Sequence, residues 1–293
     1  MTDVVRFMKN CLIVINDKAG KCRRCSVDKV RGQIGEHIFK SVHLPTNTSL
    51  DFEGYDSLAV CGGDGTLQLI MQDVYRTDKT VYYFPCGTLN DKGKAEKYCH
   101  TSERPHKITI GKVDDRVFTY VLAGGAFTDI GYNADEKNKR RFGVLAYVSK
   151  VLKSYKINRI KCKVSIDDKG KTIDYVGDFN LVMFIKSPRC FGFKFNRAFD
   201  EKDEGGHLLL IRSPRRNGIL GKIQMFFPFF RVFFLGLKKE REDTIIFKRI
   251  DSADIYLSTP IDFCMDGEKC TLFGAKRLSF VKTDCRLQVI DLD

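Results

Sequence analysis

Three glycines, an aspartate and a threonine gather in the stretch CGGDGT, residues 61–66, directly after the apolar run 57–60. Glycine permits positive φ angles and lets backbone N–H groups approach an anion closely. We expect a helix to begin near Leu67, and its N-terminus adds partial positive charge. The pattern predicts a phosphate-binding turn, in which Asp64 holds hydrated magnesium or a sugar hydroxyl and Thr66 binds a phosphate oxygen. The alternative is a tight turn with Asp64 as a helix cap.

A second turn of the same kind lies in FPCGTLND, residues 84–91, about 25 residues further along the chain. It places Gly87, Thr88, Asn90 and Asp91 after another strand-like run. Ligands of open α/β sheets bind at the carboxyl ends of the strands, so we expect the two turns to hold one nucleotide between them. Neither turn matches the GxGxxG fingerprint or the P-loop.

The elements that position these turns change in character along the chain. Residues 1–100 alternate short apolar runs with helix-length polar segments, which predicts a parallel sheet flanked by helices. From residue 105 onwards, strand-length runs dominate, including a pair around an Asp-Asp turn at 114–115. Residues 138–156 are the helical exception. The second half is therefore predicted to be mainly antiparallel β-structure.

The most apolar segment is 218–239. Four residues interrupt its apolar run: Lys222, Gln224, Pro228 and Arg231. A charge near the centre of a bilayer costs about 3 kcal/mol, so we do not expect a membrane-spanning helix. Two interpretations stay open: a buried helix pair that covers a sheet, or an amphipathic element at a lipid surface with basic residues at the headgroups.

The charge and the cysteine content limit the binding partners and the cellular compartment that we expect for this protein. Lys and Arg number 50 against 37 Asp and Glu, a net charge of +13, which favours an anionic partner. Nucleic acid is not expected, because no zinc finger, basic zipper or aromatic RNA-binding signature is present. The start of the chain lacks a secretory pattern, and eleven cysteines fit reduced core thiols, with Cys22 and Cys25 forming one CxxC. We therefore expect a cytoplasmic protein.

The two glycine turns, with the late stretch MDGE at 265–268, resemble the diacylglycerol kinase catalytic domain. Bacterial lipid kinases and sphingosine kinases share this domain, and NAD kinases are distantly related to it. The stretch INDKAG, 15–20, is similar to the opening turn of that family, and 124–132 to its bridge between domains. The resemblance implies an NAD kinase-like α/β nucleotide-binding domain at 1–115 and 276–293. It also implies a mainly antiparallel β-sandwich domain for the lipid at 116–275.

The resemblance assigns roles to individual residues. The implied reaction transfers the γ-phosphoryl group of ATP to a lipid hydroxyl. The implied ATP-binding residues are Asn16, Gly62, Gly63, Asp64, Gly65, Thr66, Gly87, Thr88 and Asn90. Magnesium would be organised by Asp64 and Asp91, directly or through water, and Asp129 would complete this acidic network. Asp266 is the implied general base, and Glu268 orients it or contacts the nucleotide; the alternative for this stretch is an ordinary hairpin turn.

Several positions depart from the family pattern. Gln68-Leu69 stands where an Asn-Glu pair is usual, and Lys92 replaces a phenylalanine, which alters the polarity beside the nucleotide. The segment between the first two strand-like runs is short of one helix. In the turn 203–207, Glu204 takes the place of an aspartate, so a second, structural magnesium stays an open alternative.

The leading hypothesis is a diacylglycerol kinase that makes phosphatidic acid while in peripheral contact with a membrane. A homodimer is left open. One alternative keeps the fold and changes the acceptor to a sphingoid base, phosphatidylglycerol, another lipid alcohol or NAD. Another is a nucleotide- or lipid-binding regulator that has lost catalysis.

Overall fold

The computed structural model describes residues 9–21, 25–35, 37–45, 50–98, 104–126 and 157–291. The helix expected at 138–156, the stretch 127–132, Asp129 and Cys22 lie outside these residues. The chain divides into two compact units, the first formed by Met1–Ile108 and Lys282–Asp293 and the second by Thr109–Val281. Each unit is described by itself.

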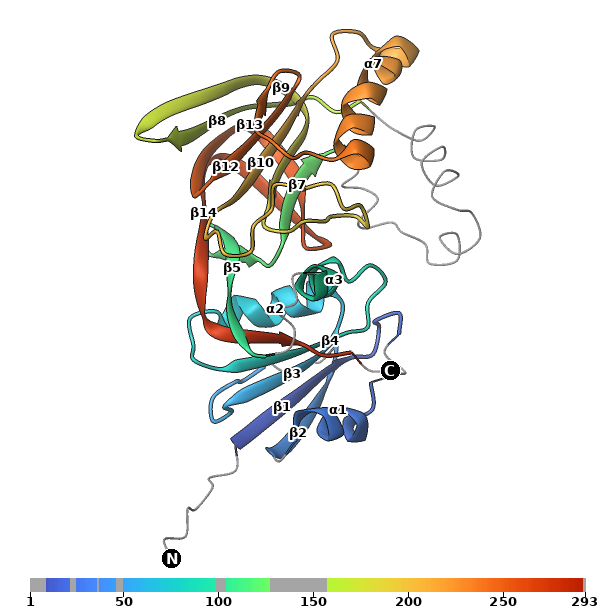
Figure 1. Ribbon diagram of the computed structural model, residues 1–293, viewed down its shortest axis with the longest axis vertical. Coiled ribbons are helices and arrows are strands. Elements are labelled where there is room, and N and C mark those ends of the chain that lie inside the picture. Colours follow the sequence, from blue (N-terminus) through green and yellow to red (C-terminus); the bar gives the residue numbers. More distant parts are fainter. Residues whose placement is uncertain are drawn as a thin grey trace, which may run out of the picture. The chain divides into compact units, whose positions relative to one another are not determined.

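The first unit contains a parallel sheet in the order β2-β1-β3-β4-β14. Its strands are β1 (Lys9–Asn16), β2 (His37–Leu44), β3 (Ser57–Gly62), β4 (Thr80–Pro85) and the last part of β14 (Glu268–Val289). Figure 1 shows helices α2 (Asp64–Val74) and α3 (Asp91–Tyr98) on one side of this sheet and α1 (Val27–Ile34) on the other. All six residues of β3 are buried, because a parallel sheet is covered on both faces. The predicted α/β architecture is confirmed.

Helix α2 begins at Asp64, three residues before the position expected from the sequence. Gly63 is its N-cap, with extended backbone (φ −91°, ψ −176°), so Asp64, Gly65 and Thr66 already belong to the first turn. The helix buries Leu67, Ile70, Met71 and Val74, which share one face. Among the described residues between β2 and β3 there is no further helix, in agreement with the short segment seen in the sequence.

A buried ion pair holds α3 together. The Lys92 ammonium lies 2.6 Å from a Glu96 carboxylate oxygen, and His106 Nε2 lies 3.0 Å from the other oxygen. Burial by itself raises the pKa of Glu96, but Lys92 and His106 outweigh it and lower that pKa to about 2. Lys92, which we expected to alter the polarity beside the nucleotide, is thus neutralised within its own helix.

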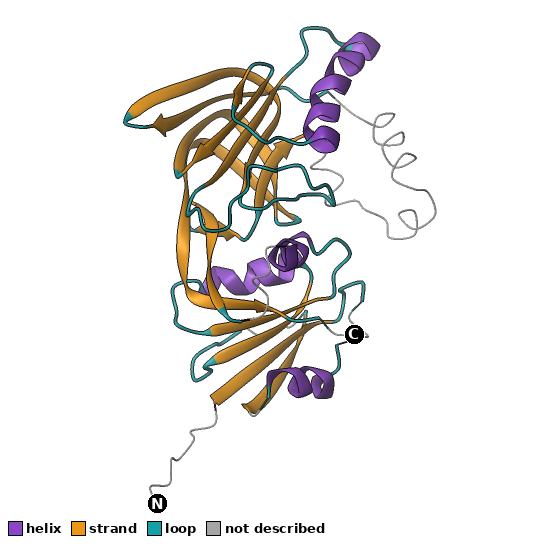
Figure 2. Ribbon diagram, viewed as in Figure 1, coloured by secondary structure: helices purple, strands orange, loops and turns teal. Residues whose placement is uncertain are grey.

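The second unit is built mainly from antiparallel strands, as predicted (Figure 2). The strands are β6 (Arg116–Phe118), β7 (Val121–Gly125), β8 (Ile160–Asp168), β9 (Lys171–Ile185), β10 (Gly206–Arg212), β11 (Arg241–Glu242), β12 (Ile245–Ile250) and β13 (Ser252–Met265). Strand β5 (His106–Val113) pairs with β6, and the first part of β14 pairs with β13. Both β9 and β13 pair with β7 and also with β8, so the strands curl around one core that contains Phe118, Phe184 and Phe263.

The apolar segment forms one helical run, so the helix pair considered from the sequence is wrong. Helix α7 (Gly218–Phe230) continues into a π-helical stretch, η2 (Arg231–Leu235). Pro228 has no N–H to donate, and the Arg231 N–H is shared between the carbonyl oxygens of Phe227 and Pro228. The buried side of the run packs on the sheet through Met225, Phe229, Val232 and Phe233.

The other side of this run leaves large apolar side chains exposed. They are Ile219, Leu220, Ile223, Phe226, Phe227, Phe230, Phe234 and Leu235. By length and composition, 218–235 is the one helix in the described part of the chain that could cross a membrane, with 28% of it buried. Length and composition are weak grounds for a span, since core helices meet the same criteria.

We predict that Lys92→Met lowers the free energy of unfolding by about 3 kcal/mol, because it leaves the Glu96 carboxylate buried without its ammonium partner. Urea denaturation at pH 7 measures this loss, and Lys94→Met, an exposed position on the same helix, is the matched control. Because the pKa of Glu96 falls from 4.5 to about 2, its stabilisation is full above pH 4.5 and declines as the pH drops towards 2. Equal losses for the two variants would contradict the prediction.

Candidate functional site

The two glycine turns meet at the carboxyl ends of β3 and β4, as the sequence predicted. The Cys86 N–H donates to the Gly62 carbonyl oxygen at 2.8 Å. A Cβ placed on Gly87 would lie 2.6 Å from the Gly63 Cα, so the turns pack backbone against backbone. A Cβ on Gly62 would lie 2.4 Å from Thr66. At Gly62 and Gly87, packing alone therefore requires glycine, whatever the turns bind.

Asp64 joins the two turns. Its carboxylate accepts the N–H groups of Asp91 at 2.7 Å and Lys92 at 3.2 Å, and the Tyr83 hydroxyl at 3.3 Å. Asp64 is the first residue of α2, yet it caps the N-terminus of α3. The alternative considered from the sequence, that Asp64 is a helix cap, is thus correct, but the capped helix is α3 and not α2.

The acids expected to hold magnesium do not fit direct coordination. Asp64 is 7% exposed, with three donors on its carboxylate, and Asp91 has no exposed surface. Magnesium keeps several waters in its shell and needs accessible oxygens. The third predicted ligand, Asp129, lies outside the described residues. Direct coordination by Asp64 and Asp91 is therefore not supported, and contact through the waters of a hydrated ion stays a prediction.

The first turn of α2 fits an anion better. Gly63 has no side chain to cap the helix, and Gly63 and Gly65 are half-exposed, so this end offers backbone N–H groups. Asn16 Nδ2 donates to the Thr66 hydroxyl oxygen at 2.8 Å, and Asn16 Oδ1 accepts the Lys18 N–H at 3.0 Å. Asn16 thus ties the turn after β1 to the start of α2.

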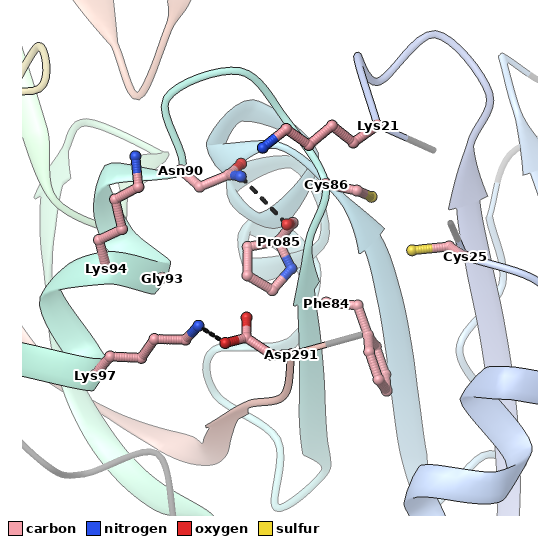
Figure 3. Close-up of a pocket in the computed structure, with 10 residues that line it drawn as sticks. All are labelled: Lys21, Cys25, Phe84, Pro85, Cys86, Asn90, Gly93, Lys94, Lys97 and Asp291. Carbon is pink, nitrogen blue, oxygen red and sulfur yellow. Dashed lines mark hydrogen bonds and ion pairs between the residues drawn. The ribbon is translucent and has the colours of Figure 1, made fainter. Parts of the chain in front are cut away.

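A cavity of about 320 Å³ opens beside the second turn (Figure 3). Its lining consists of Lys21, Cys25, Phe84, Pro85, Cys86, Asn90, Gly93, Lys94, Lys97 and Asp291. Asn90 Nδ2 donates to the carbonyl oxygens of Pro85 at 3.2 Å and Gly87 at 2.9 Å. Its Oδ1 is buried and has no hydrogen-bond partner among the described residues. A ligand hydroxyl or amino group that reaches this oxygen would satisfy it.

Lysines surround the same cavity. Lys97 pairs with Asp291, while Figure 3 shows Lys21 and Lys94 on either side of Asn90. This surplus of positive charge favours an anionic ligand. Our sequence analysis missed Lys21 and Lys94. Lys21 could have been found, since it follows the turn after β1 at the same edge of the sheet, and its N–H donates to the Cys86 carbonyl oxygen at 2.8 Å.

The structure also places Thr88 and Leu69, two further positions considered from the sequence. Thr88 is exposed on the second turn. Leu69, which stands where the family has a carboxylate, is 48% exposed on α2. The structure therefore brings Asn16, the first glycine turn, Asp64, Thr66, Gly87, Asn90 and Asp91 to one edge of the sheet.

Asp266 lies in the second unit, in the turn between β13 and β14, with φ +50°. Its carboxylate accepts the Thr119 N–H and hydroxyl and the N–H groups of Tyr120 (3.1 Å) and Val121 (2.9 Å). Burial raises its pKa to about 6, and these hydrogen bonds limit the rise. Four donors occupy the four lone-pair sites, so Asp266 must release one donor before it can take a proton. Glu268, two residues further on, is exposed.

The turn at 203–207 is held by cations of the protein itself. Arg249 binds the Asp203 carboxylate through Nε at 2.9 Å and Nη2 at 2.6 Å. The Lys186 ammonium donates to the carbonyl oxygens of Asp200 and Asp203. Arg249 also lowers the pKa of Asp203. These contacts hold Asp203 in place, and the second magnesium stays an open alternative.

Known proteins resemble this chain in both sequence and fold. The sequence model of the diacylglycerol kinase catalytic domain matches residues 10–112. A Streptococcus pneumoniae protein described as a candidate lipid kinase is 23% identical over 227 residues, which are 70% of this chain and 74% of that protein. The diacylglycerol kinase of Staphylococcus carnosus is 34% identical over 109 residues, or 33% of this chain and 36% of the relative. That match thus spans about a third of the relative's length.

A crystal structure of a candidate diacylglycerol kinase from Bacillus anthracis has the same fold. It superimposes with a TM-score of 0.68 at 18% identity, over 95% of this chain and 96% of the other. The fold class predicted from the sequence is confirmed. Over residues 10–112, the chain therefore matches the catalytic domain of the diacylglycerol kinase family.

Proposed function

We propose that this protein is an ATP-dependent lipid kinase that phosphorylates the hydroxyl group of diacylglycerol to give phosphatidic acid. The observation that carries the proposal is the match of residues 10–112 to the diacylglycerol kinase catalytic domain. The names of the staphylococcal relatives support diacylglycerol as the acceptor. A sphingoid base, phosphatidylglycerol or an NAD-like molecule remains the alternative acceptor.

ATP would bind at the edge of the sheet where the two glycine turns meet. The first turn of α2 would receive phosphate oxygens through its N–H groups, and Lys21 and Lys94 would add charge. The unpartnered Asn90 Oδ1 would accept a hydrogen bond from a ribose hydroxyl or from the adenine amino group. Asp64 supports this edge from below the surface, by holding α3 in place.

In the transfer, the lipid hydroxyl oxygen bonds to the γ-phosphorus while the bond from that phosphorus to the β–γ bridging oxygen breaks, so that ADP leaves. The proton of the hydroxyl needs an acceptor. Asp266 is our candidate, because a carboxyl group with a pKa of about 6 is ionised at neutral pH and still basic enough to take a proton. Thr119 is the donor whose hydroxyl can rotate away to free one lone pair.

The lipid would be reached by peripheral contact with a cytoplasmic membrane surface. Ile219 and Phe227 are 77% and 67% exposed on the run α7–η2. Exposed basic residues flank or interrupt this apolar face: Arg215, Arg216, Arg231, Lys238 and Lys239. Apolar side chains framed by positive charge match an anionic lipid surface.

We predict transfer of labelled phosphate from ATP to diacylglycerol in mixed micelles, with activity rising as the pH passes about 6 and Asp266 ionises. Asp266→Asn should lower the rate at least about 100-fold. Thr119→Val removes a donor that favours the ionised carboxylate, so the midpoint of its pH profile should move upwards. The same assay is run with a panel of other lipids and NAD. If label appears only in one of these acceptors, that acceptor replaces diacylglycerol in the proposal.

Thermal unfolding shows whether Asp266→Asn is still folded. If that variant is folded and keeps its activity, and Thr119→Val keeps the wild-type pH midpoint, Asp266 is an anchor for the turn at 119–121 and not the base.

For Asn90→Ser we predict an approximately tenfold weaker affinity for ATP, measured by calorimetric titration, because a ligand donor loses its buried acceptor (about 1.4 kcal/mol). Asn10→Ser is the matched control, since Asn10 also donates its side-chain N–H to a turn carbonyl, Gly54 O at 3.1 Å. An unchanged affinity in Asn90→Ser would exclude Asn90 from the ATP site.

We predict that Ile219→Ser with Phe227→Ser reduces binding to phosphatidylserine vesicles by at least about tenfold, since each side chain loses roughly 1.5–3 kcal/mol of apolar burial. Vesicle sedimentation at low and high salt measures this binding, and the binding of the wild type should weaken as the salt concentration rises. Val176→Ser in β9 is the control, because Val176 is 63% exposed away from this helix. Equal binding of the double variant and wild type, or self-association through this face without vesicle binding, would reject the membrane contact.

A further inference from the structure

Three cysteines lie together beside the candidate ATP site. Cys61 is near the end of β3, Cys86 follows β4, and Cys25 precedes α1; all three belong to one buried cluster. Cys61 is opposite Phe84 in the parallel pairing of β3 and β4. Cys86, two residues beyond Phe84, therefore faces the same side of the sheet as Cys61. None of the nine cysteines in the described part of the chain forms a disulfide.

Cys25 differs chemically from the other thiols. Hydrogen bonds with Cys61 and Cys86, assisted by the charge of Lys29, outweigh burial and lower the pKa of Cys25 to about 4. Burial instead raises the pKa of Cys162 to about 12 and that of Cys285 to about 11. Since the thiolate is the nucleophile, the lowered pKa favours Cys25 as the attacking thiol of the cluster.

Two of the three cysteines border a cavity. Cys25 and Cys86 both line the cavity beside Asn90, and Figure 3 shows their side chains pointing towards each other. Cys61 has no exposed surface and lies within a strand. Cys86 directly follows β4, outside the strand.

We propose that Cys25 and Cys86 form a thiol–disulfide exchange site, and that the bond between them weakens ligand binding at the adjoining glycine turn. The second half of this proposal rests on the proposed ATP-binding function. Only a small disulfide, RS–SR, is needed as the oxidant.

The exchange proceeds in two balanced steps. The Cys25 thiolate attacks one sulfur of RS–SR, which forms a mixed disulfide and expels RS⁻. Cys86 then loses its proton, attacks the Cys25 sulfur and expels the second RS⁻, which is protonated. The two cysteines are together oxidised by two electrons, and RS–SR is reduced to two RSH, of which one takes its proton from Cys86 and the other from the solvent.

The coupling to the ligand site follows from the contacts of Cys86. Its N–H holds Gly62 and its carbonyl oxygen holds the Lys21 N–H, both at 2.8 Å. The next residue, Gly87, packs on Gly63 and accepts from Asn90. A disulfide requires Cβ atoms about 3.5–4.5 Å apart. Fixing Cys86 to Cys25 at that separation therefore constrains both glycine turns and the lysine beside them.

The first test treats the full chain with 2-hydroxyethyl disulfide, blocks remaining thiols and maps cross-linked peptides by mass spectrometry. We expect a Cys25–Cys86 disulfide that is absent in Cys25→Ser and present in the control Cys285→Ser. A Cys22–Cys25 or Cys25–Cys61 disulfide in its place, or none at all, would overturn the proposal. This result does not depend on kinase activity.

The second test compares ATP affinity before and after oxidation. We expect oxidation to weaken it by about fivefold or more, with recovery in dithiothreitol and no effect in Cys25→Ser. Equal affinity of the oxidised and reduced forms would reject the coupling. If reduced protein does not bind ATP, the proposed function fails, and the exchange site is then judged by the peptide map alone.

Discussion

The carboxylate of Asp64 is the anchor on which the nucleotide edge depends. It is buried, and a buried charge is costly unless hydrogen bonds compensate it. The N-terminus of α3 supplies that compensation through the N–H groups of Asp91 and Lys92. The same contact fixes α3 against the start of α2, and it requires the two turns to approach so closely that a Cβ on Gly87 would lie 2.6 Å from the Gly63 Cα. The glycines and the aspartate therefore form one packing unit, and the surface that a ligand would meet is its outer side.

A second buried aspartate repeats this design in the other unit. Asp266 holds the turn at 119–121 through three N–H groups and one hydroxyl, much as Asp64 holds the start of α3. The difference lies in the balance of forces, because for Asp266 burial outweighs the donors and raises the pKa to about 6. A carboxyl group that is held in place and titrates near neutrality can serve both as an anchor and as a proton acceptor. Only the Thr119 hydroxyl, among its donors, can leave without moving the backbone.

The spacing of the glycine turns could be predicted because it depends on local rules: strands end where glycines follow apolar runs, and parallel strands end at one edge. The partner of Asp64 could not be predicted, since it lies 27 residues away and is met only after β4 has paired with β3. Lys92 was interpreted as a change in polarity, although Glu96, four residues on, was a readable ion-pair partner. The burial of the Lys92–Glu96 pair, which makes the pair strong, comes from tertiary packing and could not be predicted. The surroundings of Cys25 could not be predicted either, because its neighbours Cys61 and Cys86 come from two other segments.

The helix α7–η2 shows why composition alone left two interpretations open. Phenylalanines occur at 226, 227, 229, 230, 233 and 234, so aromatic side chains point to several sides of the helix, and no single apolar face stands out. The aromatic side chains form two columns along the helix. Phe229 stacks on Phe233 along the buried side, with ring centroids 6.1 Å apart, and Phe230 stacks on Phe234 along the exposed side at 5.3 Å. One column completes the core of the second unit. The other remains an apolar surface framed by arginine and lysine, so the segment combines the two properties that the sequence presented as alternatives.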